Sequence, residues 1–127
     1  MKKTATLLIV LSIFSGCAKK DTDAPRVVTT NPQNGSIDID PSLSEISVTF
    51  NEEMMDNSWS WSMENQDTFP QTTGSPHYTD GNTKNILPVK LLPGKEYVIW
   101  INTSNITNFK DKSGNPAVPF KFTFKTK

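Results

Sequence analysis

Few residues of this sequence could carry out chemistry. The chain has one cysteine, Cys17, and one histidine, His77, which excludes an internal disulfide and any zinc site built from several cysteines or histidines. His77 lies in a turn-rich segment and is predicted to be a solvent-facing loop residue. Glu52 and Glu53 are adjacent, so on a strand their carboxylates would point to opposite faces and could not form a catalytic pair. We therefore predict that the protein is not an enzyme and uses no cofactor.

Three tryptophans are candidate ligand-binding residues. Trp59 and Trp61 alternate with serines, and side chains two apart on one strand lie about 6.6–6.8 Å apart. At that spacing two indoles could stack on consecutive sugar rings, and with Trp100 they form a candidate platform for a polysaccharide. The alternative is that the indoles pack inward, as buried tryptophans do in many β-sandwich cores. We favour the inward interpretation for at least one of the three.

A second candidate site begins at Asp111. Asp111, Ser113 and Asn115 carry side-chain oxygens at alternate positions, as at the start of a calcium-binding loop. The further carboxylates and the bidentate glutamate of an EF-hand do not follow. Aspartate and asparagine in such a segment usually bond to neighbouring backbone amides, so we favour a structural turn. Asp111, with help from Asp38 or Asp40, is kept as a weak calcium candidate, and no other metal site is predicted.

Length and charge narrow the possible functions. The 127 residues leave room for one domain of ordinary size. Lysines and arginines number 13, and so do aspartates and glutamates, which gives a formal net charge of zero. Nucleic-acid-binding proteins need clustered cations to neutralise phosphates, so we predict no nucleic-acid partner.

The first 17 residues form a unit of their own. A basic start is followed by an apolar run from Ala5 to Phe14 and by Ser15 and Gly16 before Cys17. The run is shorter than the roughly 20 residues that a membrane-spanning helix needs, and it fits a secretory signal. Residues 14–17 resemble the lipobox of bacterial lipoproteins, with Phe14 in place of the usual leucine. The resemblance implies cleavage before Cys17 and attachment of diacylglycerol, with palmitate-type acyl chains, to its thiol.

These features divide the chain into three parts. We predict a lipoprotein signal peptide at residues 1–16, a lipidated N-terminus and tether at 17–24, and one domain at 25–127. Ala18 follows the cysteine, and lipoproteins without aspartate there usually proceed to the outer membrane. Lys19–Asp23 resembles the charged signals that some lipoproteins use for surface export, but it would also serve as a solvated linker. Both a periplasmic and a surface-facing orientation remain open.

From Pro25 onward, short regular segments alternate with turns. β-branched, alternating or apolar residues predict strands at residues 26–30, 46–50, 59–63, 86–89, 97–101 and 120–125. Pro88 suits an edge strand or a bulge. Residues 97–101 have apolar side chains on both faces, which indicates a central strand or one covered by a loop. The segment from Pro25 to the C-terminus shows no helical period, and parallel pairing would need helical crossovers. We therefore predict an all-β, antiparallel two-sheet sandwich of about seven strands.

Five segments of this domain resemble, in order, those of one known family. They are Ala24–Gly35, Phe50–Asp56, Leu91–Tyr97, Asp111–Pro116 and Phe122–Thr126. The family is the bacterial Ig-like domain of S-layer and cell-surface proteins; the segment between Trp59 and Tyr78 is more aromatic than is usual there. The resemblance implies an Ig-like sandwich with a scaffold, spacer or adhesive role and no catalysis.

Together these observations predict a lipid-anchored module of the cell envelope with a non-catalytic binding, adhesion or scaffold role. Its membrane contact would be the lipid on Cys17 at the outer membrane, and its partner an envelope protein or a glycan. The alternative is a carbohydrate-binding surface lipoprotein that uses Trp59, Trp61 and Trp100. That alternative requires at least two indoles exposed on one face.

Overall fold

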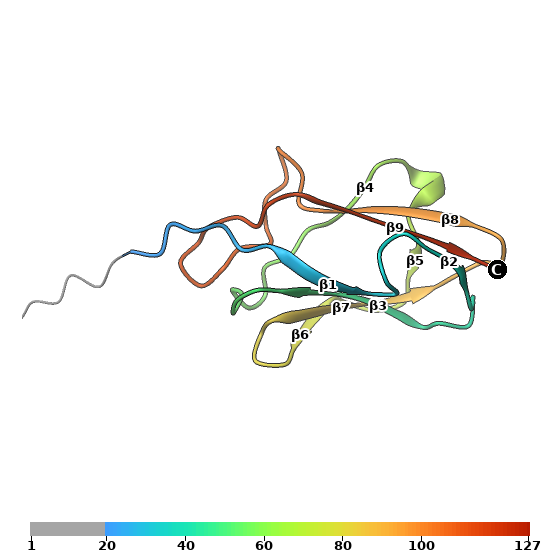
Figure 1. Cartoon of the computed structure of the whole chain (residues 1–127), viewed down its shortest axis with the longest axis horizontal. Helices are drawn as coiled ribbons and strands as arrows, with labels where there is room; N and C mark the ends of the chain where they lie inside the picture. The colour runs from blue at the N-terminus through green and yellow to red at the C-terminus, as the bar shows by residue number, and fades with distance from the viewer. Residues whose placement is uncertain (1–19) are drawn as a thin grey trace, which may run out of the picture.

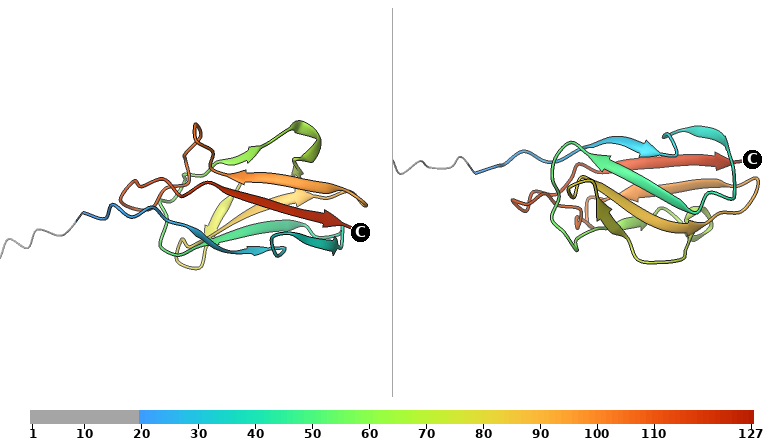
Figure 2. Two further views of the ribbon diagram at one scale, coloured as in Figure 1. Left: turned by 45° about the horizontal axis from the view of Figure 1, so that its top comes forward. Right: turned by 90° about the horizontal axis from the view of Figure 1, so that it is seen from below.

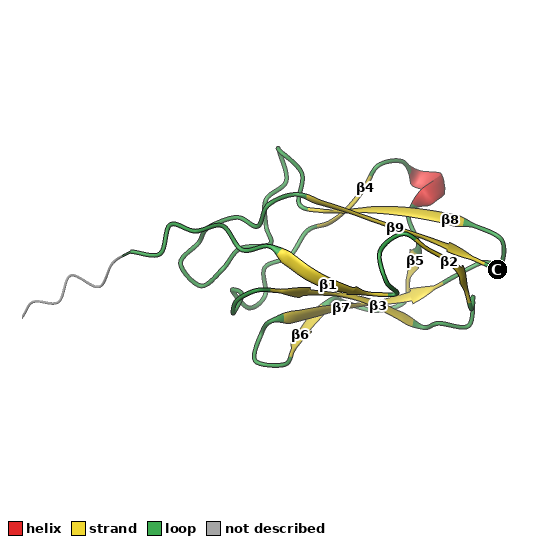
Figure 3. Ribbon diagram, in the orientation of Figure 1, coloured by secondary structure: helices red, strands yellow, loops and turns green. Residues whose placement is uncertain are grey.

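The computed structural model of the protein describes residues 20–127, and Figure 1 shows two β-sheets packed face to face. This part of the chain contains nine strands and one three-residue 3₁₀ helix, η1 (Gln66–Thr68), which is the red segment in Figure 3. The predicted all-β two-sheet sandwich is confirmed. Among residues 20–127, no helix has the length and hydropathy needed to cross a membrane.

The first sheet is built around β7 (Lys84–Lys90). One side of β7 pairs antiparallel with β3 (Glu45–Phe50), which in turn pairs with β1 (Val27–Asn31). The other side pairs with two short strands, β6 (His77–Thr79) and β5 (Gln71–Thr72). The loop position predicted for the histidine of β6 is wrong, although its side chain is exposed as expected.

Pro88 lies in this central strand, so the prediction that it marks an edge or a bulge is wrong. The Val89 N–H donates to Ser44 O at 2.9 Å, so along a pleated strand the nitrogen of Pro88 faces away from β3. On that other side Pro88 lies between the residues that pair with β6 and those that pair with β5. A proline is tolerated there because no partner strand needs its N–H.

The second sheet has the order β2 (Ser36–Ile39), β9 (Phe120–Thr126), β8 (Glu96–Ile101) and β4 (Trp61–Met63). The β9–β8 and β8–β4 pairs are antiparallel, but β2 and β9 are parallel, contrary to the expectation that every pair is antiparallel. The two strands stand near opposite ends of the domain sequence. The rest of the sandwich therefore connects them, and no helical crossover is needed.

The core lies between the sheets. On β8 and β9 the side chains of Tyr97, Ile99, Ile101, Phe122 and Phe124 are buried, as the predicted alternation requires. The rings of Tyr97 and Phe124 stack with their centroids 5.2 Å apart. These aromatic and branched side chains supply much of the apolar burial that stabilises so small a domain.

The two ends of the described chain lie at opposite ends of the sandwich (Figure 2). At the N-terminal end, the Asn115 side-chain amide donates to Asp21 O at 2.9 Å, and the Val118 N–H donates to Pro25 O at 3.0 Å. The predicted tether therefore contacts the domain from Asp21 onward. Cys17 and the predicted signal peptide lie outside the described residues.

Candidate functional site

An apolar groove opens between the sheets on one side of the sandwich. β4 and β5 are the outermost strands there, and they have only three and two residues, so each sheet leaves part of the other's inner face uncovered. A cavity of about 590 Å³ lies between them, which we call the inter-sheet groove. Its large lining side chains are Trp59, Trp61, Met63, Phe69, Leu87 and Ile106.

The groove brings together two of the three predicted tryptophans. Trp61 lies opposite Ile101 of β8, and its indole N–H donates to Asn85 Oδ1, in the other sheet, at 2.8 Å. Its ring meets that of Phe109 edge-on at 5.8 Å. Trp59 precedes β4, so the predicted strand begins two residues later than expected, and its ring lies 6.2 Å from that of Tyr78. Both indoles are half-buried.

Trp100 does not reach the groove. Its neighbours along β8, Ile99 and Ile101, belong to the core, so Trp100 lies on the outer face of the second sheet. There it is paired with Ser62 of β4 and Lys121 of β9. The three tryptophans therefore do not form one surface, and a sugar platform using Trp59 and Trp61 stays a prediction.

The inter-sheet groove continues into a second cavity of about 270 Å³, with Met63 and Phe69 common to both. No charged side chain of the described chain lines the first cavity. The second is lined in addition by Leu92, Lys90 and Lys95, and Lys95 Nζ lies 5.4 Å from the centroid of the Tyr97 ring. The combined surface is therefore aromatic and apolar along most of its length and cationic at one end.

The sequence could predict only part of this groove. The alternation of residues 59–63 predicted that Trp59, Trp61 and Met63 lie together, and all three line the groove, although Trp59 precedes β4. Phe69, Leu87 and Ile106 come from a loop, a strand and another loop, and no local pattern connects them. Only the tertiary fold shows that they line one surface.

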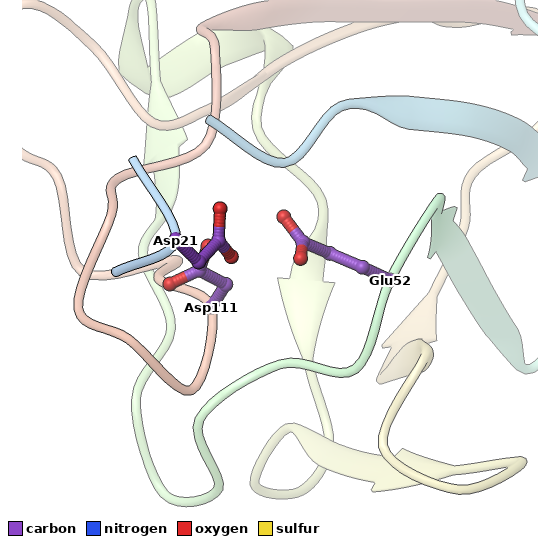
Figure 4. A group of neighbouring side chains, drawn as sticks. All are labelled: Asp21, Glu52 and Asp111. Carbon is purple, nitrogen blue, oxygen red and sulfur yellow. The ribbon is translucent and has the colours of Figure 1, made fainter. Parts of the chain in front are cut away.

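A separate cluster of three carboxylates lies at the end of the sandwich where the tether docks. Figure 4 shows the side chains of Asp21, Glu52 and Asp111 pointing toward a common centre, and their carboxylate oxygens lie within 4.8 Å of one another. Asp111 is only 1% exposed and accepts hydrogen bonds of 2.9 Å from the backbone N–H groups of Ser113 and Asn115. It also accepts one from the Asn115 side chain at 2.9 Å. These contacts confirm the predicted turn.

The expected helpers of Asp111 lie elsewhere. Asp40 accepts a hydrogen bond from Ser42 N, which is the main cause of its lowered pKa, and the charge of Lys127, at the other end of the sandwich, lowers this pKa further. Asp38 is on β2, which pairs with the C-terminal half of β9. The expectation that Asp38 or Asp40 would assist Asp111 is therefore wrong, because the fold places Asp21 and Glu52 beside it instead.

The carboxylate cluster shifts the ionisation of its members in opposite directions. Desolvation and the nearby charges of Asp111 and Asp21 raise the pKa of Glu52 to about 7. Burial opposes ionisation of Asp111, but hydrogen bonds from Asn115 and Ser113 outweigh it and lower its pKa. Carboxylate oxygens are suitable calcium ligands, but those of Asp111 already accept three protein hydrogen bonds. The raised pKa of Glu52 favours a proton on that carboxyl in the folded cluster, and calcium at Asp111 stays a prediction.

We expect the stability of the domain to fall as the pH rises toward 8, in part because of Glu52. Its pKa is raised from 4.5 in the unfolded chain to about 7 in the folded one. The folded state therefore holds a proton that the unfolded state loses between these values. This contribution is complete below pH 4.5 and is lost as the pH rises through about 7. Glu52→Gln, which is neutral at every pH, should flatten the fall in Tm measured by circular dichroism.

Glu53→Gln is the matched control, because Glu53 faces away from the cluster and pairs with Lys112 at 2.7 Å on the surface. It should leave the pH profile of the wild type in place. Equal profiles for Glu52→Gln and wild type would contradict the assignment. In the same samples, a rise in Tm on adding calcium at high pH, lost in Glu52→Gln, would support the calcium candidate.

Comparisons with known proteins identify a family and solved structures with a similar fold. A family model described as a bacterial Ig-like domain matches residues 21–126. The crystal structure of the S-layer protein rSbsC(31-844) is similar, with a TM-score of 0.50 and 18% identity over 83% of this chain. A structure of surface layer protein SbsC, domains 1–6, gives a TM-score of 0.51 and 17% identity over 81% of this chain. The match covers only 14% of each of those two chains. No curated protein sequence matches this chain.

Proposed function

Because the chain belongs to the bacterial Ig-like domain family, we propose that it acts as a non-catalytic module of the cell envelope, anchored by lipid on Cys17. The family match over residues 21–126 is the observation that carries the proposal. It accounts for nearly everything that follows the predicted signal and lipidation site. Within the described residues, the surface available for binding is that of one β-sandwich.

The predicted anchor would hold this module close to the membrane. The domain contacts its own N-terminal segment at Asp21, whose backbone carbonyl accepts a hydrogen bond from the Asn115 side chain. Three residues lie between Cys17 and Asp21, and even when fully extended these four Cα–Cα steps span roughly 14 Å. Several acyl chains on one cysteine, at about 0.8 kcal/mol per buried methylene, bind a membrane firmly. The N-terminal end of the sandwich would then face the lipid, and the C-terminal end would point away.

A binding or spacer role suits the described side chains better than catalysis. Glu52 faces Asp21 and Asp111, whereas Glu53 pairs with Lys112 on the surface. The two adjacent glutamates therefore point apart, as the sequence predicted, and cannot work on one substrate. The inter-sheet groove is instead apolar and aromatic, which is typical of a recognition surface.

Protease treatment of intact cells tests the envelope location and the orientation together. We expect the protein in the membrane pellet, and we expect added protease to degrade it without lysis if Lys19–Asp23 acts as an export signal. Protection until the outer membrane is opened would count against surface export and favour the periplasmic face. Recovery of the mature protein in the cytosolic fraction would contradict the proposed function.

Carbohydrate binding is the second candidate, because Trp59 and Trp61 both line the inter-sheet groove. This role requires their indole faces to be accessible to a sugar ring. Quenching of tryptophan fluorescence by a soluble envelope polysaccharide, lost on Trp59→Ala, would support it. Trp100→Ala is the matched control, since Trp100 lies on the outer face of the second sheet.

A further inference from the structure

We propose that the inter-sheet groove binds an extended peptide segment of a partner protein, with apolar side chains in its aromatic part and an acidic residue at its lysine end. The inference rests on the proposed binding role of the module and names the partner's chemistry. It differs from the carbohydrate candidate in what occupies the same surface.

The edges of the two sheets provide the first argument. β4 and β5 are the outermost strands on either side of the groove, and neither has a further strand beside it in the described chain. Edge strands present backbone N–H and C=O groups that can pair with an added strand. Extended peptides are commonly bound in this way, with main-chain hydrogen bonds supplying affinity and side-chain pockets supplying specificity.

The distribution of exposed apolar side chains provides the second argument. The described chain has six large hydrophobic residues that are clearly exposed, and three of them line the groove or its continuation. They are Met63 at 56%, Leu92 at 52% and Ile106 at 46% exposed. Single exposed apolar residues are normal, but several around one aromatic cavity mark an interaction surface. Methionine and tryptophan are typical of surfaces that adapt to peptide side chains.

Charge defines the direction and composition of the peptide. Lys90 and Lys95 line the continuation of the groove, and neither forms an ion pair with a described residue. No charged side chain of the described residues lines the larger cavity. A complementary segment is therefore apolar where it passes Trp61 and Met63 and acidic where it reaches the lysines.

The hydrogen bonding in the groove favours a peptide over a sugar. The indole N–H of Trp61 is directed away from a ligand, to Asn85. Ser60 Oγ donates to Asn102 and accepts from Asn108 N, and Thr103 Oγ1 accepts from two backbone N–H groups of its own loop. The Trp61 indole N–H and the Ser60 hydroxyl are thus already paired, which leaves the side chains of Ser62, Thr72, Thr103 and Asn108 as the polar groups of the cavity that the hydroxyls of a sugar could use. An extended peptide needs only the strand edges and the apolar wall.

The test uses the mature lipidated protein in phosphatidylcholine nanodiscs and fluorescent peptides of about six residues, the usual length of a strand. One peptide alternates valine with threonine and ends in two aspartates. The second ends in two lysines. The third is the first with a central proline, which removes an N–H and fixes the backbone. Fluorescence anisotropy, with empty nanodiscs as the blank, gives the affinities.

We expect the aspartate-ended peptide to bind best and the proline to weaken binding by about tenfold or more. Met63→Glu should weaken binding by a similar factor. Met55→Glu is the matched control, because Met55 is also exposed, at 37%, but lines neither cavity. Lys95→Glu should reverse the preference between the aspartate-ended and lysine-ended peptides.

Equal affinities of Met63→Glu and Met55→Glu, an unaffected proline peptide, or no binding of any peptide would each overturn the inference. Quenching of Trp59 by a polysaccharide without peptide binding would overturn it in favour of the carbohydrate candidate. Any of these results, obtained with a protein that stays in the membrane pellet of cells, would leave the proposed function standing. Recovery of the protein in the cytosolic fraction would instead contradict the proposed function itself.

Discussion

Replacing Asn102 with leucine is expected to destabilise the domain by about 4 kcal/mol, a large part of the 5–15 kcal/mol typical of a folded domain. Asn102 is fully buried, and its amide nitrogen donates to Phe109 O at 2.9 Å and to Ala117 O at 3.0 Å. Its oxygen accepts from Phe109 N at 2.9 Å and from Ser60 Oγ at 2.6 Å. Leucine would leave these buried partners without hydrogen bonds, each at a cost of about 1–3 kcal/mol when water cannot replace the lost partner.

Backbone conformation adds to this effect. Asn102 has φ 60°, in the left-handed region that asparagine tolerates and a bulky apolar residue does not. Urea unfolding followed by circular dichroism measures the loss. Asn105→Leu is the matched control, since Asn105 lies in the same loop with an exposed side chain and should change stability by less than about 0.5 kcal/mol. Equal stabilities of the two variants would contradict the role assigned to Asn102.

Replacing Cys17 with serine is expected to have the largest effect on the protein in cells. A serine hydroxyl cannot form the thioether to diacylglycerol, so labelling by an alkyne-tagged fatty acid should fall to background. The variant should also be lost from the outer-membrane fraction, because one β-sandwich without acyl chains has no comparable membrane affinity. Ser15→Ala is the matched control, since it keeps a small residue before the predicted cleavage site and should still be labelled. Persistent labelling of Cys17→Ser would contradict the anchor.

The strands that the sequence predicted correctly are those with a strong burial signal. In β9, Phe122 and Phe124 alternate with polar residues, and the fold buries them while exposing Lys121 and Lys125. β2 lacked such a signal, because its Ile37 is 65% exposed and a turn cluster precedes it. Local patterns report which side chains are buried, so an edge strand with exposed apolar residues is hard to distinguish from a loop.

Contacts between residues far apart in the sequence could not be predicted either. Asn102 forms hydrogen bonds with Ser60, Phe109 and Ala117, residues that no local pattern connects with it. The carboxylates of Asp21, Glu52 and Asp111 come from the start, middle and end of the domain. Pro88 led to a wrong edge assignment because the sequence does not show that two short strands share one side of β7. Side-chain types could be predicted as candidates, but their partners depend on the tertiary fold.

The intact mass of the protein extracted from the membranes of the cells that make it tests the central claim most directly. We predict a chain that begins at Cys17, lacks residues 1–16 and carries the added mass of diacylglycerol on that residue. A chain with an unmodified Cys17 thiol, whether or not residues 1–16 have been removed, would contradict the proposal of a lipid-anchored envelope module.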